Sequence, residues 1–190
     1  VGQFESQCDL LVDGLTKFWL NGCRGGGNKQ ESYDLPYYFA VNHTKTDAFQ
    51  KRGQKGYLIT IGDEPPPRVL TAGDINKVFG TNPEGNVTFE QLVSQVRRTY
   101  IPIHIIIEEG SHVRAYGLDT VLTPWRNLLG EDAIVCSDYT KLAEIITSIL
   151  QVKAGMNAKD VIDSWDGSTS VAVSKAVSSL TTQQDSSVVF

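Results

Sequence analysis

The stretch IPIHIII, residues 101–107, decides the fold of this chain. It is apolar on both faces, which is typical of a central strand in a parallel sheet that helices cover on two sides. Two shorter apolar runs, YLITI at 57–61 and AIVC at 133–136, predict further strands. Because helical patterns separate the three runs, the sequence predicts an α/β fold with a parallel sheet and right-handed crossovers.

Capping residues and apolar spacing predict the helices. Thr71 with Asp74 forms a capping box, Thr88 precedes a helix with an apolar face, and Asp138 precedes another. We expect helices over the segments 4–18, two pieces within 31–49, 72–79, 89–96, 118–129, 139–150, 157–165 and 169–180. Ser168 or Thr169 is expected to cap the last of these helices. Residues 51–56 are expected to form a solvated turn and residues 108–117 a polar loop.

Composition excludes several classes of function. The 190 residues carry a net charge of −5 with a pI of about 5.2, which argues against a nucleic-acid surface. No apolar run reaches the roughly 20 residues that a membrane span needs, and no signal peptide opens the chain. The three cysteines form no CxxC pair, so we expect reduced thiols in a cytoplasmic protein.

Polar residues follow each predicted strand. The carboxyl ends of parallel strands share one edge of a sheet, where ligands bind. That edge should carry Asp63, Glu64, Glu108, Glu109, Ser111, His112, Ser137 and Asp138. Oxygen ligands at this density suit a Mg²⁺-like ion, but carboxylates also cap helix N-termini, where the helix dipole favours them. Both interpretations stay open at this point.

The glycine-rich stretch GCRGGGNKQES, residues 22–32, fails the tests for a phosphate-binding loop. A P-loop needs G-x-x-x-x-G-K-[ST] directly after a strand, whereas Asn28 and Gln30 flank Lys29 and a helix comes before the stretch. The dinucleotide fingerprint G-x-G-x-x-G is also absent. We interpret the stretch as a turn that carries Glu31 and Ser32 to the ligand edge.

No nucleophile motif stands out. The chain has no G-x-S-x-G, and His104 lies inside the strongest strand, where a core role is expected. Cys136 closes a buried strand and is expected to pack rather than react. His112 is the histidine that falls in a loop at the ligand edge.

Four pieces of sequence, in order, resemble the von Willebrand factor A (vWA) domain in its intracellular bacterial and phage form. They are GGGNKQESYDLPYYFA, KRGQKGYLITIGDE, IPIHIIIEEGSH and WRNLLGEDAIVCSDYTKLAEIITSIL. The resemblance covers most of residues 1–180. It implies a Rossmann-like sheet with helices on both faces, in a domain whose usual function is to bind another protein.

The resemblance also implies a metal-ion-dependent adhesion site, with Mg²⁺ as the expected ion. Asp63 in ITIGDE matches the aspartate of that site, and Glu31 or Ser32 stands where the family has a threonine. The D-x-S-x-S motif of the family occurs nowhere in this sequence, and its place would lie before Val1. The implied metal ligands are therefore Asp63, Ser32 and Glu31.

Three predicted strands make an incomplete sheet, because the family fold has six. We expect either a preceding segment or another chain to supply the remaining strands, since an open edge is a liability. The expected organisation is the C-terminal portion of a vWA-like domain over 1–154, a helical extension over 155–182 and a flexible tail over 183–190.

The resemblance implies a non-enzymatic adaptor or assembly factor that binds a protein, with a MoxR-type AAA+ ATPase as a partner known for bacterial relatives. A structural component of a virion or large complex, with a degenerate metal site, is the first alternative. The second is a metal-dependent hydrolase that uses the acidic edge with His112.

Overall fold

The computed structural model describes residues 7–17 and 31–180. Its main sheet has three parallel strands, β1 (Gly56–Gly62), β4 (Tyr100–Ile107) and β5 (Ala133–Cys136), in the order β1-β4-β5. The strand with the IPIHIII sequence is central, as its two apolar faces predicted. The fold is Rossmann-like α/β, and the three expected strands are confirmed.

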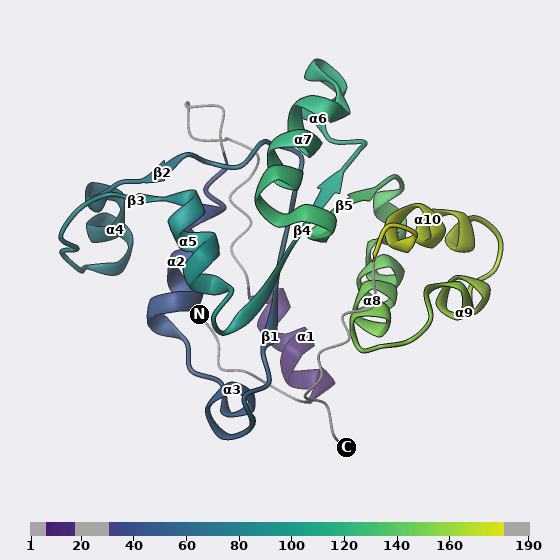
Figure 1. Ribbon diagram of the computed structural model, residues 1–190, viewed down its shortest axis with the longest axis horizontal. Coiled ribbons are helices and arrows are strands. Elements are labelled where there is room, and N and C mark those ends of the chain that lie inside the picture. Colours follow the sequence, from purple (N-terminus) through teal and green to yellow (C-terminus); the bar gives the residue numbers. More distant parts are fainter. Residues whose placement is uncertain (1–6, 18–30, 181–190) are drawn as a thin grey trace.

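Helices cover the sheet on both faces because side chains of β4 alternate between two cores. Ile103 and Ile105 pack with α8 (Leu142–Lys153), α9 (Ala158–Asp163) and α10 (Gly167–Val177). Ile106 packs on the opposite face with α2 (Asp34–His43), α5 (Phe89–Val96) and α7 (Leu118–Leu129). Figure 1 shows α8, α9 and α10 gathered beyond β5, at the opposite end of the molecule from α4 (Ala72–Phe79).

The predicted caps form as hydrogen bonds. The Thr71 side chain accepts from the backbone N–H of Asp74 at the start of α4. Thr88 and Gln91 make a reciprocal capping box at the start of α5, which satisfies two N–H groups of the first turn. Local signals therefore placed both of these helices.

Other elements differ from the expectation. The predicted polar loop after β4 contains α6 (Ser111–Tyr116), and the predicted turn at 51–56 includes the end of α3 (Asp47–Arg52). A small antiparallel pair, β2 (Val69–Leu70) with β3 (Val87–Thr88), was not predicted. Asp166 precedes α10, ahead of the expected cap at Ser168 or Thr169, and its side chain makes no capping bond. Asp138 caps a 3₁₀ turn, η2 (Tyr139–Lys141), which leads into α8.

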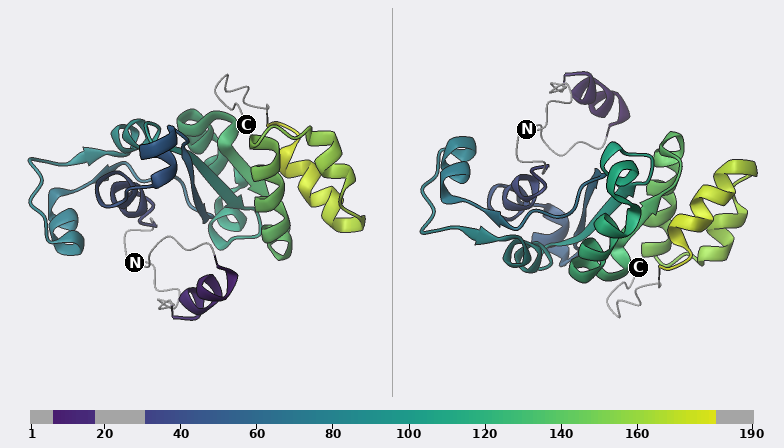
Figure 2. Two further views of the ribbon diagram at one scale, coloured as in Figure 1. Left: turned by 90° about the horizontal axis from the view of Figure 1, so that it is seen from below. Right: turned by 90° about the horizontal axis from the view of Figure 1, so that it is seen from above.

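The helix α1 (Cys8–Thr16) has no buried residue, and its Leu11 and Leu15 are exposed. Both views of Figure 2 show it lying apart from the rest of the molecule. Some predictions fall on residues 1–6, 18–30 and 181–190, outside the described residues; these are the glycine-rich turn and the tail. None of the described helices has the length and apolar character needed to cross a bilayer.

Candidate functional site

The three loops at the carboxyl ends of the strands share one edge of the sheet, because all three strands are parallel. Asp63, which follows β1, uses its carboxylate to cap a helix of the next loop. Its Oδ2 accepts a hydrogen bond of 2.8 Å from the backbone N–H of His112, in the first turn of α6. Gly110 permits this approach, because a Cβ at that position would overlap the Asp63 side chain. The cap that α6 lacks locally therefore comes from the β1 loop.

Glu31, which lies just before α2, also contacts the residues at the end of β1. The Tyr33 hydroxyl donates to the Glu31 carboxylate, and the backbone N–H of Glu31 donates to Glu64 Oε2 at 2.6 Å. Gly62 makes room for this contact, since a Cβ there would overlap the Tyr33 hydroxyl. Trp125 of α7 donates its indole N–H to the carbonyl oxygen of Glu64 at 3.0 Å. These bonds join the approach to α2, the β1 loop and α7.

We refer to Glu31, Tyr33, Asp63, Glu64 and His112 as the carboxyl-edge cluster. Partial burial raises the pKa of Glu64, and the charges of Glu31 and Asp63 raise it further, while His112 opposes the shift. Burial also raises the pKa of Tyr33, assisted by its hydrogen bond to Glu31. Three carboxylates thus lie near one another, and Tyr33 remains a protonated donor at neutral pH.

The acidic residues that follow β4 and β5 are held by other partners. Lys175 of α10 forms an ion pair of 2.6 Å with Glu108. Glu109 accepts from the backbone N–H of Tyr139 at 2.9 Å, and Asp138 accepts from that of Thr140 at 3.0 Å. The single acidic edge expected from the sequence is therefore divided into two groups with separate structural tasks.

His104 and Cys136 belong to opposite cores. The His104 ring is fully buried and stacks on Trp125 with ring centroids 3.7 Å apart. Cys136 is buried among the side chains of α8 and α10, and its thiol donates to the carbonyl oxygen of Asp138. Both expected packing roles are confirmed, and the two side chains do not form a Cys–His pair.

The three predicted metal ligands, Asp63, Ser32 and Glu31, lie at the end of β1 and just before α2. Glu31 and Asp63 share the carboxyl-edge cluster, and Glu31 also lines a cavity together with Ser32, Asp34 and Asp74. Within residues 7–17 and 31–180, no three Asp, Glu, His or Cys side chains are arranged to hold a metal ion. Asp63 and Asp138 instead cap helical turns, which is the alternative interpretation of these carboxylates. The assignment of Asp63, Ser32 and Glu31 as metal ligands stays a prediction.

The edge strand β1 has polar backbone groups that the rest of the described chain does not pair. The backbone N–H of Gly56 bonds to Thr99 beside β4, so alternation turns the N–H groups of Leu58 and Thr60 toward β4 as well. The N–H groups of Tyr57, Ile59 and Ile61 then point away from β4, where no other described strand lies. β1 is thus a free edge.

One face of β1 is also only partly covered. Tyr57 and Ile61 point to the side of the sheet that α8 and α10 cover beneath β4 and β5, yet their exposed fractions are 37% and 40%. Strands of parallel sheets are ordinarily buried on both faces. This bare face was not found from sequence, because YLITI has the composition of a fully buried strand.

Sequence reasoning also missed the hydrogen bond of Tyr33 to Glu31 and that of Trp125 to the carbonyl oxygen of Glu64. The buried position of Asp34 in the first turn of α2 gave no signal either. No family model, curated protein or solved structure matches the chain. Function is therefore inferred from the free edge of β1 and from the side chains around the carboxyl edge of the sheet.

Proposed function

We propose that this chain is a non-enzymatic, vWA-type protein-binding module whose partner supplies a strand to the free edge of β1. The observation that carries the proposal is the combination of outward N–H groups at Tyr57, Ile59 and Ile61 with a half-bare apolar face on the same strand. A partner strand would satisfy those backbone groups, and its flanking segment would cover the face.

The two edges of the sheet differ in how they are protected. Proteins blunt exposed edges with short strands, prolines, charged side chains or bulges. β5 has only four residues, whereas β1 has seven and carries no proline or charged residue between Gly56 and Gly62. An unprotected apolar edge in a chain with a net charge of −5 is better explained by a docking partner than by a free surface.

The carboxyl-edge cluster supports binding over hydrolysis as the function. Asp63 and Glu64 each accept a hydrogen bond from a distant segment, and Glu31 accepts one from the Tyr33 hydroxyl, so their carboxylates already have structural tasks. We propose that this chain supplies only part of an adhesion-type ion site, and that an ion there needs further ligands from the partner. The strand contact does not depend on that ion.

A charge at the edge of β1 tests the proposal. We expect Ile61→Lys to abolish co-purification of the partner from cells that produce the chain naturally, because the ammonium group would be buried under the partner's segment that covers this face. Val171→Lys is the matched control, since Val171 is 70% exposed on α10, far from the edge. Equal recovery of the same partner with both variants would rule out docking on β1.

A further inference from the structure

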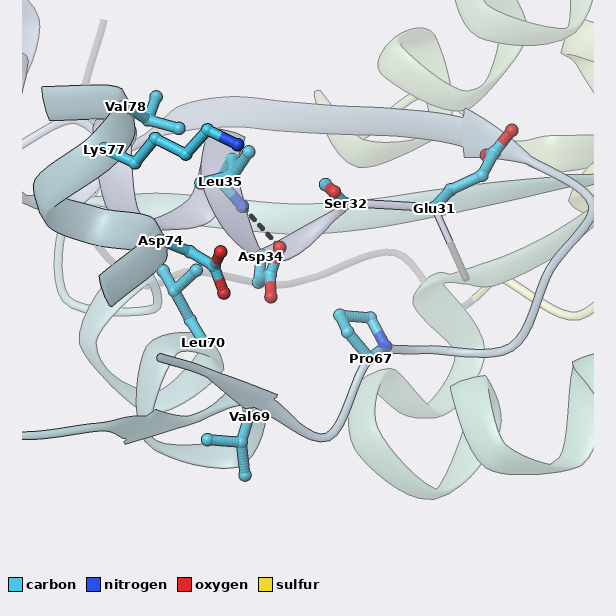
Figure 3. A pocket seen from close by; sticks show the side chains of 10 residues that line it. All are labelled: Glu31, Ser32, Asp34, Leu35, Pro67, Val69, Leu70, Asp74, Lys77 and Val78. Carbon is cyan, nitrogen blue, oxygen red and sulfur yellow. Dashed lines mark hydrogen bonds between the residues drawn. The ribbon is translucent and has the colours of Figure 1, made fainter. Parts of the chain in front are cut away.

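A cavity of about 300 Å³ lies between the N-terminal turn of α2, the strand β2 and the helix α4. Of the carboxyl-edge cluster, Glu31 alone lines this cavity, and no residue of β1 does. Figure 3 shows the carboxylates of Asp34 and Asp74 facing each other at its base, with Val69 and Val78 on its walls. We refer to this cavity as the α2–α4 socket.

The base of the socket holds a buried carboxylate whose charge is only partly compensated. Asp34 is 7% exposed, and its Oδ1 accepts the backbone N–H of Leu35 at 2.9 Å. Its second oxygen lies on the side of Asp74, as Figure 3 shows, and Asp74 itself accepts from the Thr71 hydroxyl. Burial and the charge of Asp74 together raise the pKa of Asp34. Two facing carboxylates in a partly closed site favour a cation between them.

The one lysine on the socket wall does not supply that cation in the described chain. Lys77 lines the cavity, yet no ion pair within residues 7–17 and 31–180 joins it to Asp34 or Asp74. Figure 3 shows its amino group on the side of Leu35, away from the two carboxylates. Within residues 7–17 and 31–180, no ion pair therefore neutralises the negative charge at the base.

The side chains on the walls of the socket indicate which kind of cationic group would fit there. Val69 and Val78 are 43% and 53% exposed, and the buried Leu70 lines the same cavity. An apolar wall above an acidic base matches a side chain with an aliphatic stem and a charged end. A guanidinium group fits two carboxylates better than an ammonium group does, because its planar fork can bond to both. A bare metal ion is disfavoured, since the described side chains offer no three-ligand set.

We propose that the α2–α4 socket binds an arginine side chain of a protein partner. The statement that the arginine belongs to a protein partner rests on the proposed binding function. The preference of the socket for an arginine side chain does not depend on that function. The contact would place an anchor residue of the partner beside α2, in addition to its strand on β1. Buried arginines in pockets are frequent energetic centres of protein interfaces.

The test is a titration of the ¹⁵N-labelled full chain with N-acetyl-L-arginine methylamide, followed by NMR in the presence of a chelator. The matched probe is the citrulline analogue, which has the same shape without the charge. We expect saturable shifts of the backbone signals of Asp34, Leu35 and Asp74 with the arginine probe, and none with the citrulline probe. Asp34→Asn and Asp74→Asn should each weaken binding at least about tenfold.

Three further variants complete the test. Asp160→Asn should bind like the wild type, because Asp160 is an exposed acidic residue in the first turn of α9 and lies outside the socket. Lys77→Met should tighten binding, since it removes a competing positive charge from the wall. Ile61→Lys should also titrate like the wild type, which separates this proposal from the one for β1.

Equal shifts with the citrulline probe, undiminished binding by Asp34→Asn, or no saturable shift of the socket residues would each overturn the arginine assignment. None of these results would affect docking on β1. Conversely, equal recovery of the partner with Ile61→Lys and Val171→Lys, together with an unchanged arginine titration, would contradict only docking on β1.

Discussion

At the scale of single residues, His104 is the most constrained titratable group of the core. Its ring stacks on Trp125, meets Tyr33 edge-on with centroids 4.9 Å apart, and shares a hydrogen bond of 2.8 Å with the Thr60 hydroxyl. Its Nε2 has no partner among the described residues. Burial lowers the pKa of His104 to about 3, so the folded protein holds a neutral imidazole at neutral pH.

This lowered pKa predicts that acid destabilises the protein through His104. The unfolded chain binds a proton at this histidine below pH about 6.5, whereas the folded chain does so only near pH 3. The free energy of unfolding should therefore fall by about 2 kcal/mol between pH 7 and pH 5 from this group alone. Urea unfolding at both values measures the fall. His104→Phe, which keeps a ring against Trp125, should reduce it by that amount, and an unchanged pH dependence would contradict the burial of a neutral imidazole.

Asp63 gives a second residue-scale prediction, because its carboxylate caps α6. Asp63→Ala should lower the free energy of unfolding by about 1 kcal/mol, and Asp63→Asn should have little effect, since asparagine is an equally good capping acceptor. Chemical unfolding of both variants measures the difference. If asparagine costs as much as alanine, the negative charge rather than the hydrogen bond is what the site needs.

At the scale of elements, the sequence predicted those whose signals are local. The run IPIHIII, the cap at Thr71 and the box of Thr88 with Gln91 each lie within the element that they specify. α6 was missed because its cap, Asp63, comes from a residue 49 positions earlier in the chain. The pair β2–β3 was missed because two-residue strands have no periodicity to detect.

The strand β1 predicts a distinctive pattern of amide hydrogen exchange in the isolated chain. The N–H groups of Leu58 and Thr60 bond to β4, and those of Tyr57 and Ile59 point to the free edge. We expect the outward pair to exchange at least about a hundredfold faster than the inward pair. NMR-detected exchange resolves the four residues separately. Equal protection of all four would mean that another part of this chain already pairs with β1.

At the scale of the whole molecule, parallel topology could be predicted, but the use of its carboxyl edge could not. Strand order alone brings Asp63, Glu108 and Asp138 to the same edge, as predicted. Their side chains then engage His112, Lys175 and Thr140 respectively, through contacts that depend on tertiary packing. The uncovered face of β1 likewise depends on where α8 and α10 end, which no local pattern of the strand contains.

The same arrangement predicts how the isolated chain responds to Mg²⁺. Because the described carboxylates do not converge on one point, calorimetry should detect no saturable binding of Mg²⁺ to the chain alone at millimolar concentrations. Asp63→Asn, which keeps the cap, serves as the control variant. Saturable heat in the wild type that disappears in Asp63→Asn would show that this chain forms an ion site without a partner.

The central claim is that a second protein docks on β1, and site-specific photo-crosslinking tests it most directly. Benzoylphenylalanine is placed at Ile61 on the free edge or at Tyr139, which is 60% exposed beyond β5. In cells that produce the chain naturally, we expect a discrete adduct with another protein from position 61 and none from position 139. No adduct from position 61, the same adduct from both positions, or a link from position 61 to residues 1–30 of the same chain would contradict it.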